Sequence, residues 1–174
     1  MTSVQRLLSF ALIVALLPAG HSVLPVHADV VPGNDLHLES HRGSVVLVDF
    51  WASWCGPCRK SFPWMNEMHE KYSAEGLVII AVNVDRDRNA AQAFLKKRPA
   101  RFQVVYDTKG QLAQKYELEA MPSSFLYDRE GHLVSDHLGF VEKESAGMEA
   151  DIEALLHGEA SENGSNQTAV EDDD

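Results

Sequence analysis

The feature that most limits the possible folds is an apolar run that ends at two closely spaced cysteines. Val45–Trp51 is nearly all apolar and mostly β-branched, which predicts a strand buried on both faces. Cys55 and Cys58, the only cysteines of the 174 residues, follow it. From there, apolar or amphipathic residues recur at steps of three and four, as on one face of a helix: Cys58, Phe62, Met65, His69 and Tyr72. We therefore expect a thiol pair at a strand-to-helix junction.

The rest of the chain alternates between strand and helix patterns. The first helix is predicted to end at Gly76, and further helices at 89–97, 110–117 and 141–157. Strands are predicted at 77–84, 102–106, 124–127 and 132–137, with a short edge strand within 29–44. This order predicts one α/β domain over residues 29–157, with a central mixed β-sheet flanked by helices on both faces.

The two ends of the chain have compositions of their own. Residues 1–28 carry one positive charge, an apolar core at 7–17 and small residues before Ala28, which predicts a cleaved signal peptide. A buried helix or an uncleaved membrane anchor are the alternatives. Residues 158–174 predict a disordered acidic tail. The formal net charge of −11, with no basic stripe to offset it, argues against nucleic-acid binding.

The cysteine pair is best interpreted as a redox centre. Backbone N–H groups at a helix N-terminus are expected to stabilise a Cys55 thiolate, so Cys55 would attack a disulfide. Cys58, one turn into the helix, would be shielded and would resolve the mixed disulfide. Gly56 allows the tight turn, and Pro57 suits the first helical turn. A structural staple closing so small a loop adds little stability. A zinc site would need further ligands, but the chain has no second cysteine pair and its histidines show no ligand spacing. We therefore predict no metal ion or cofactor.

Asp49 and two tryptophans surround this centre. A carboxylate on a buried strand is costly, so we expect a raised pKa for Asp49 and a role in accepting the Cys58 proton. A structural, hydrogen-bonded acid is the alternative. Period two places Asp49 and Trp51 on one face of the strand. Trp51 is predicted to pack in the core, and Trp54 to line a groove that binds the substrate.

The stretch from Trp51 to Arg59 resembles the active-site motif of the thioredoxin superfamily. Asp49 matches the buried acid of that family, and Pro63 its helix-kinking proline. By this resemblance the Met121–Pro122 bond is cis, the Met121 backbone pairs with the substrate, and Gly139 lies near the groove. The resemblance implies a thioredoxin-like fold.

The stretch between the second strand and Pro122 is longer than in plain thioredoxin. That insertion, a helix and a strand, is similar to the TlpA/ResA-like branch of exported bacterial thiol-disulfide reductases. The chain departs from the cytochrome-maturation members of that branch. Ser61 stands where they often carry glutamate, and Asp49 where they tend to have asparagine. Ala81 stands near the place of the thioredoxin lysine that neighbours the buried acid.

The resemblance implies a periplasmic disulfide reductase that acts on disulfide-bearing exported proteins. Its electrons would come from a membrane thiol donor, and its potential would lie below about −220 mV, between thioredoxin and the strong oxidants. The alternatives are a disulfide oxidase or isomerase, and a module that binds copper or a partner protein in cytochrome or oxidase assembly.

Overall fold

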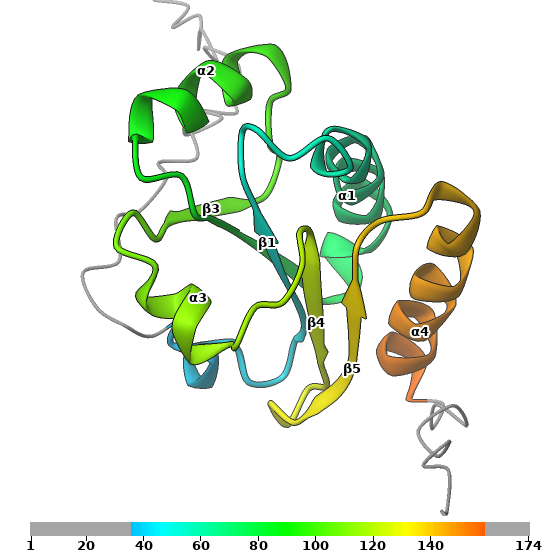
Figure 1. The fold of residues 1–174 in the computed structure, drawn as a ribbon. Helices are drawn as coiled ribbons and strands as arrows, with labels where there is room; N and C mark the ends of the chain where they lie inside the picture. The colour runs from blue at the N-terminus through cyan, green and yellow to red at the C-terminus, as the bar shows by residue number, and fades with distance from the viewer. Residues whose placement is uncertain (1–35, 159–174) are drawn as a thin grey trace, which may run out of the picture.

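The computed structural model describes residues 36–158, and its centre is a five-stranded sheet in the order β3-β2-β1-β4-β5 (Figure 1). The three strands β1, β2 and β3 run parallel, and β4 and β5 are antiparallel to their neighbours. The predicted mixed sheet is therefore confirmed. The strands span Val45–Trp51 (β1), Leu77–Asn83 (β2), Gln103–Tyr106 (β3), Ser123–Tyr127 (β4) and Leu133–Leu138 (β5).

Within residues 36–158, four α-helices and three 3-10 turns accompany the strands. The inserted helix and strand predicted before Pro122 are α2 and β3, and β3 extends the sheet at its parallel edge. The α-helices span Cys58–Tyr72 (α1), Arg88–Lys97 (α2), Gln111–Lys115 (α3) and Ser145–His157 (α4). The 3-10 turns are Leu38–His41 (η1), Ser73–Glu75 (η2) and Glu142–Glu144 (η3).

Two buried clusters lie on opposite faces of the sheet, as the alternation along β1 predicts. The first cluster holds both cysteines and side chains from α1, α2 and α4. Its centre is aromatic, because the Trp51, Phe62 and Phe94 rings pack with centroids 4.8 Å apart. The second cluster holds Phe50, and residues of α3 cover it. Helices therefore cover both faces, and the cysteines belong to the α1 face.

Two predicted elements differ in the structure. In the described part of 29–44 there is a 3-10 turn in place of an edge strand, because Leu36 turns into the second cluster instead of extending along the sheet. The helix predicted at 110–117 is shorter, since Glu117 adopts a left-handed φ of 50° that a helix cannot continue.

The predicted signal peptide of residues 1–28 and the tail after Gly158 lie outside the described residues. Between residues 36 and 158, no helix combines the length and the apolar character needed to cross a bilayer.

Candidate active site

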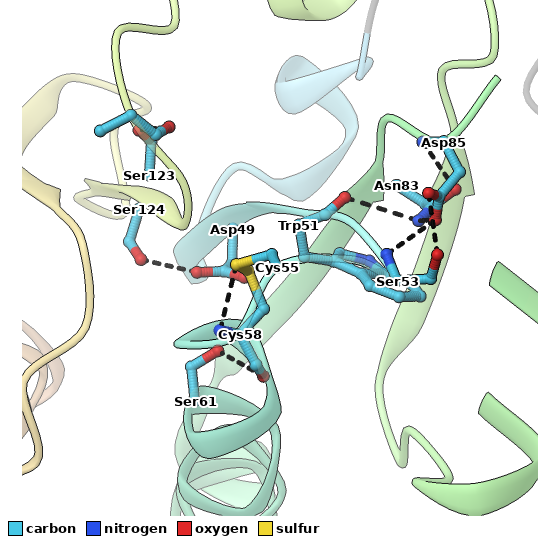
Figure 2. Close-up of a disulfide and its surroundings, with 11 residues drawn as sticks. Asp49, Trp51, Ser53, Cys55, Cys58, Ser61, Asn83, Asp85, Ser123 and Ser124 are labelled. Carbon is cyan, nitrogen blue, oxygen red and sulfur yellow. Dashed lines mark hydrogen bonds between the residues drawn. A yellow bond between two sulfur atoms is a disulfide. The ribbon is translucent and has the colours of Figure 1, made fainter. Parts of the chain in front are cut away.

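The loop between β1 and α1 carries the cysteine pair, and Cys55 and Cys58 form a disulfide (Figure 2). The backbone N–H of Cys58 points at the Cys55 sulfur, with 3.1 Å between nitrogen and Sγ. This donor comes from the first turn of α1, where N–H groups have no partner within the helix. The same donor would stabilise negative charge on Cys55 once the disulfide opens.

The two sulfurs differ in burial in the predicted order. Cys58 has no exposed surface, and Cys55 retains 4%. An attacking thiol is expected to be accessible, but Cys55 is nearly buried in this disulfide form. Its bond to the buried Cys58 holds the sulfur inward. Gly56 and Pro57, between the cysteines, are exposed. A partner approaching this loop therefore meets these two residues first.

The two tryptophans near the pair have different environments. Trp51 is fully buried in the first cluster, as predicted. Trp54 is 66% exposed, so its indole is available on the surface beside the cysteines. An exposed tryptophan at this position can contribute apolar surface to a bound protein.

Asp49 is a buried acid with one satisfied oxygen. Its carboxylate is 1% exposed, and its Oδ1 accepts a hydrogen bond of 2.7 Å from the Ser124 hydroxyl of β4. Its Oδ2 has no hydrogen-bond partner among the described residues. Burial raises the pKa of Asp49 from its ordinary 3.8 to about 7, and the Ser124 hydrogen bond opposes part of that rise. The raised pKa agrees with the expectation from the sequence.

The neighbours of Asp49 explain why its pKa is so high. In the strand register, Ser124 pairs with it on one side and Ala81 on the other, so neither strand places a cation beside it. Figure 2 draws Asp49 between Ser124 and the cysteine pair. Ser61, one helical turn beyond Cys58, is buried and donates its hydroxyl to the Cys58 carbonyl at 3.2 Å. The arrangement supplies one titratable group that can take up a proton near neutral pH.

A second polar network fixes the cysteine loop, and sequence reasoning missed it. The carboxylate of Asp85 accepts hydrogen bonds from the Ser53 N–H at 2.8 Å and the Ser53 hydroxyl at 3.0 Å. Asn83, the last residue of β2, donates to the same carboxylate at 2.8 Å. Asp85 is only 4% exposed. Figure 2 shows it hydrogen-bonded to Ser53 and Asn83. This Asp85 tether joins the loop to the end of the neighbouring strand.

The turn before β4 brings the predicted cis-proline to the same region. The Met121–Pro122 bond is cis, as predicted. The Met121 side chain packs against the first cluster, which contains both cysteines. The Gly139 N–H donates to the Pro122 carbonyl at 2.7 Å, and Gly139 has a φ of 81° that favours glycine. The fold therefore gathers Met121, Pro122 and Gly139 around the turn that faces the first cluster.

Within residues 36–158, no group of three or more His, Cys, Asp or Glu side chains could hold a metal ion. The described site offers a cysteine pair and a neighbouring buried acid.

Comparison with known proteins places the chain among its relatives. The Redoxin family model matches residues 18–156. This chain belongs to the Redoxin family. The resemblance of its cysteine motif to the thioredoxin superfamily is thereby confirmed, and the Redoxin domain covers all the elements that carry the site.

Several Redoxin relatives bear names that refer to disulfide chemistry. The chain is 35% identical over 112 residues to the thiol-disulfide oxidoreductase ResA of Bacillus thuringiensis subsp. konkukian, covering 64% of this chain and 65% of ResA. It thus spans just under two thirds of the length of that relative. A Chlorobium tepidum structure, assigned as a thiol:disulfide interchange protein DsbE, is 49% identical with a TM-score of 0.67, covering 68% of this chain and 84% of that one.

StoA of Bacillus subtilis is similar as well, with 25% identity and a TM-score of 0.55 over 63% of this chain and 84% of StoA. The thioredoxin-like fold expected from the cysteine motif agrees with both structural neighbours.

Proposed function

We propose that this Redoxin protein is a periplasmic thiol-disulfide oxidoreductase that reduces disulfides of exported proteins. The observation that carries the proposal is the Cys55–Cys58 disulfide at the start of α1, with the Cys58 N–H 3.1 Å from the Cys55 sulfur and Cys58 fully buried. The relatives named thiol-disulfide oxidoreductase and thiol:disulfide interchange protein support it.

In the reduced protein, the Cys55 thiolate attacks one sulfur of the substrate disulfide. The Cys55–substrate bond forms, the substrate S–S bond breaks, and the second substrate sulfur leaves as a thiolate that takes a proton from water. Cys58 then attacks Cys55, and the first substrate sulfur leaves as the second thiol. The substrate gains two electrons and two protons, and the protein ends with the Cys55–Cys58 disulfide.

Asp49 accepts the Cys58 proton in the second step. With a pKa raised to about 7, its carboxylate can accept a proton near neutral pH and pass it on. Its Oδ2, which has no hydrogen-bond partner within residues 36–158, is the atom that takes that proton. Asp49 and the cysteines share the α1 face of the sheet, which supports this role.

The substrate binds across the exposed end of the site. Trp54, Gly56 and Pro57 supply the exposed surface on the cysteine side. On the other side, the Met121 backbone beside Pro122 pairs with an extended segment of the substrate. A membrane thiol protein returns two electrons to the disulfide after each turnover. Residues 1–28 direct export, and they anchor the protein in the membrane if they are not cleaved.

Two variants and a measurement of the reduction potential of the Cys55–Cys58 pair test the proposal. Cys55→Ser is expected to abolish insulin reduction, because the attacking thiolate is lost. Cys58→Ser is expected to accumulate mixed disulfides through Cys55, which mass spectrometry can identify in periplasmic extracts. The reduction potential is expected below about −220 mV. A potential near −120 mV would instead assign the protein as an oxidase, and retained activity in Cys55→Ser would remove the proposed chemistry.

A further inference from the structure

The positive charge of this acidic protein is concentrated around α2. The chain has 26 acidic residues against 15 lysines and arginines. Residues 86–101, which include α2, hold one acidic residue, Asp87, and six basic ones: Arg86, Arg88, Lys96, Lys97, Arg98 and Arg101. The segment around α2 is therefore opposite in sign to the whole molecule, and the interpretation that no basic stripe offsets the acidic charge was wrong for this segment.

Three cations line a pocket of about 440 Å³ between α2 and the first turn of α1. They are Arg59 from α1, and Lys97 and Arg98 at the end of α2. Among residues 36–158, no carboxylate lines this pocket. Ser53 and Phe94 form part of its wall.

Within the part of the chain that the structure describes, these three cations also lack acidic partners. Elsewhere Lys71 pairs with Glu67 and Glu149, and Arg101 pairs with Glu70. Among the described residues, Arg59, Lys97 and Arg98 form no ion pair. The pocket therefore presents positive charge that the fold itself does not neutralise.

The pocket is partly preorganised and adjoins the reactive loop. The Arg98 guanidinium lies 5.4 Å from the centroid of the Phe94 ring, an arrangement that restricts its position. Ser53 stands two residues before Cys55, and the Asp85 tether holds it in place. The Asp85 carboxylate is buried, and both of its oxygens accept hydrogen bonds, from Ser53 and Asn83. A group bound in the pocket would lie next to the loop that carries the attacking sulfur.

We propose that this pocket binds carboxylate side chains of an acidic segment in the protein whose disulfide Cys55 attacks. Guanidinium and ammonium groups bind carboxylates through charge-assisted hydrogen bonds. Two helices contribute the cations, so the pocket fits a chain with several carboxylates better than one small anion. The pocket supplies selectivity among disulfides, which the sulfur chemistry does not provide. This inference rests on the proposed function.

The test compares two peptides that contain the same disulfide loop. One carries three glutamates beside the loop, and the other carries glutamines at those positions. The full chain in its reduced form is expected to show a higher kcat/KM for the glutamate peptide. Each of Arg59→Gln, Lys97→Gln and Arg98→Gln should reduce the glutamate-to-glutamine ratio by about two- to fivefold, as for an exposed ion pair. The triple variant should bring the ratio near one.

Lys60→Gln is the matched control, because Lys60 is exposed and adjoins Arg59 but does not line the pocket. It removes the same charge from the same turn of α1, so it also controls for any effect on Cys55. In 1 M salt, where the Debye length falls to about 3 Å, the wild-type ratio should fall toward one. Thermal unfolding of each variant checks that the fold is intact.

A ratio near one in the wild type, or an equal loss in Lys60→Gln, overturns the inference. A preference that emerges only after residues 159–174 are deleted also overturns it, since the chain's own acidic residues would then occupy the pocket. Calorimetric binding of a glutamate peptide that carries serines in place of its cysteines tests the pocket without redox chemistry. This serine peptide can bind in an Arg98-dependent manner while the protein reduces neither of the two disulfide peptides. In that case the proposed function fails but the pocket assignment stands.

Discussion

Replacing Asp49 with asparagine should change how the stability of the protein depends on pH. The substitution keeps the size of the side chain and keeps an oxygen that can accept the Ser124 hydroxyl. It removes the ability to ionise. The side-chain NH₂ group takes the place of Oδ2, which has no partner in the described structure. Any cost of burying that group is independent of pH.

The magnitude follows from the pKa of Asp49. Burial moves it from 3.8 to about 7, so the folded protein holds this proton more tightly than the unfolded chain does. The free energy of unfolding therefore falls as pH rises between these two values. At about 1.4 kcal/mol for each pH unit, the loss amounts to about 4 kcal/mol. In Asp49→Asn this contribution is absent.

Urea unfolding of the oxidised protein at several pH values between 4 and 8 measures the effect. The difference in unfolding free energy, Asp49→Asn minus wild type, should rise by about 4 kcal/mol across this range. Other titrating groups cancel in the difference. Asp136→Asn removes one exposed carboxylate on β5 and serves as the charge-matched control. Parallel stability curves for wild type and Asp49→Asn would show that the buried acid does not hold a proton near neutral pH.

Three further substitutions examine the surroundings. Ser124→Ala removes the hydrogen bond that lowers the pKa of Asp49, so the stability loss in the same urea titration should extend to higher pH; an unchanged curve would contradict this. Trp54→Ala should change the unfolding free energy by less than about 0.5 kcal/mol but reduce kcat/KM for a protein disulfide at least about fivefold, whereas equal activity would remove Trp54 from the binding surface. Phe62→Ala should cost about 3–5 kcal/mol in urea unfolding, and a cost under 1 kcal/mol would mean that the aromatic cluster is not the core.

The fold was largely predictable because its signals are local. The apolar run Val45–Trp51 and the one at 77–84 are long and β-branched, so they identify the central strands without knowledge of their partners. The cysteine motif then fixes where the first helix begins. The predicted strand within 29–44 was wrong in its described part. A short segment with two apolar residues has the same pattern whether it pairs with the edge of a sheet or packs on its face.

The surroundings of the site were less predictable because they depend on pairing between distant strands. Ser124 meets Asp49 only through the antiparallel register of β4 against β1, which no local pattern encodes. Asn83 and Asp85 carried an available signal, since polar residues at the carboxyl end of a buried parallel strand gather at the edge where sites form. The basic pocket depends on how α2 packs beside the first turn of α1, and the sequence reasoning passed over the cluster of basic residues in that segment.

The Cys55–Cys58 disulfide would be broken and formed again in every catalytic cycle, so the Ser53–Asp85 hydrogen bonds matter for the shape of the loop. A bond that is repeatedly opened cannot be what maintains the shape of its loop. Here that shape is maintained by a carboxylate whose partners contain no sulfur and are untouched by electron transfer. The oxidised and reduced molecules can therefore share one scaffold, and little rearrangement stands between them.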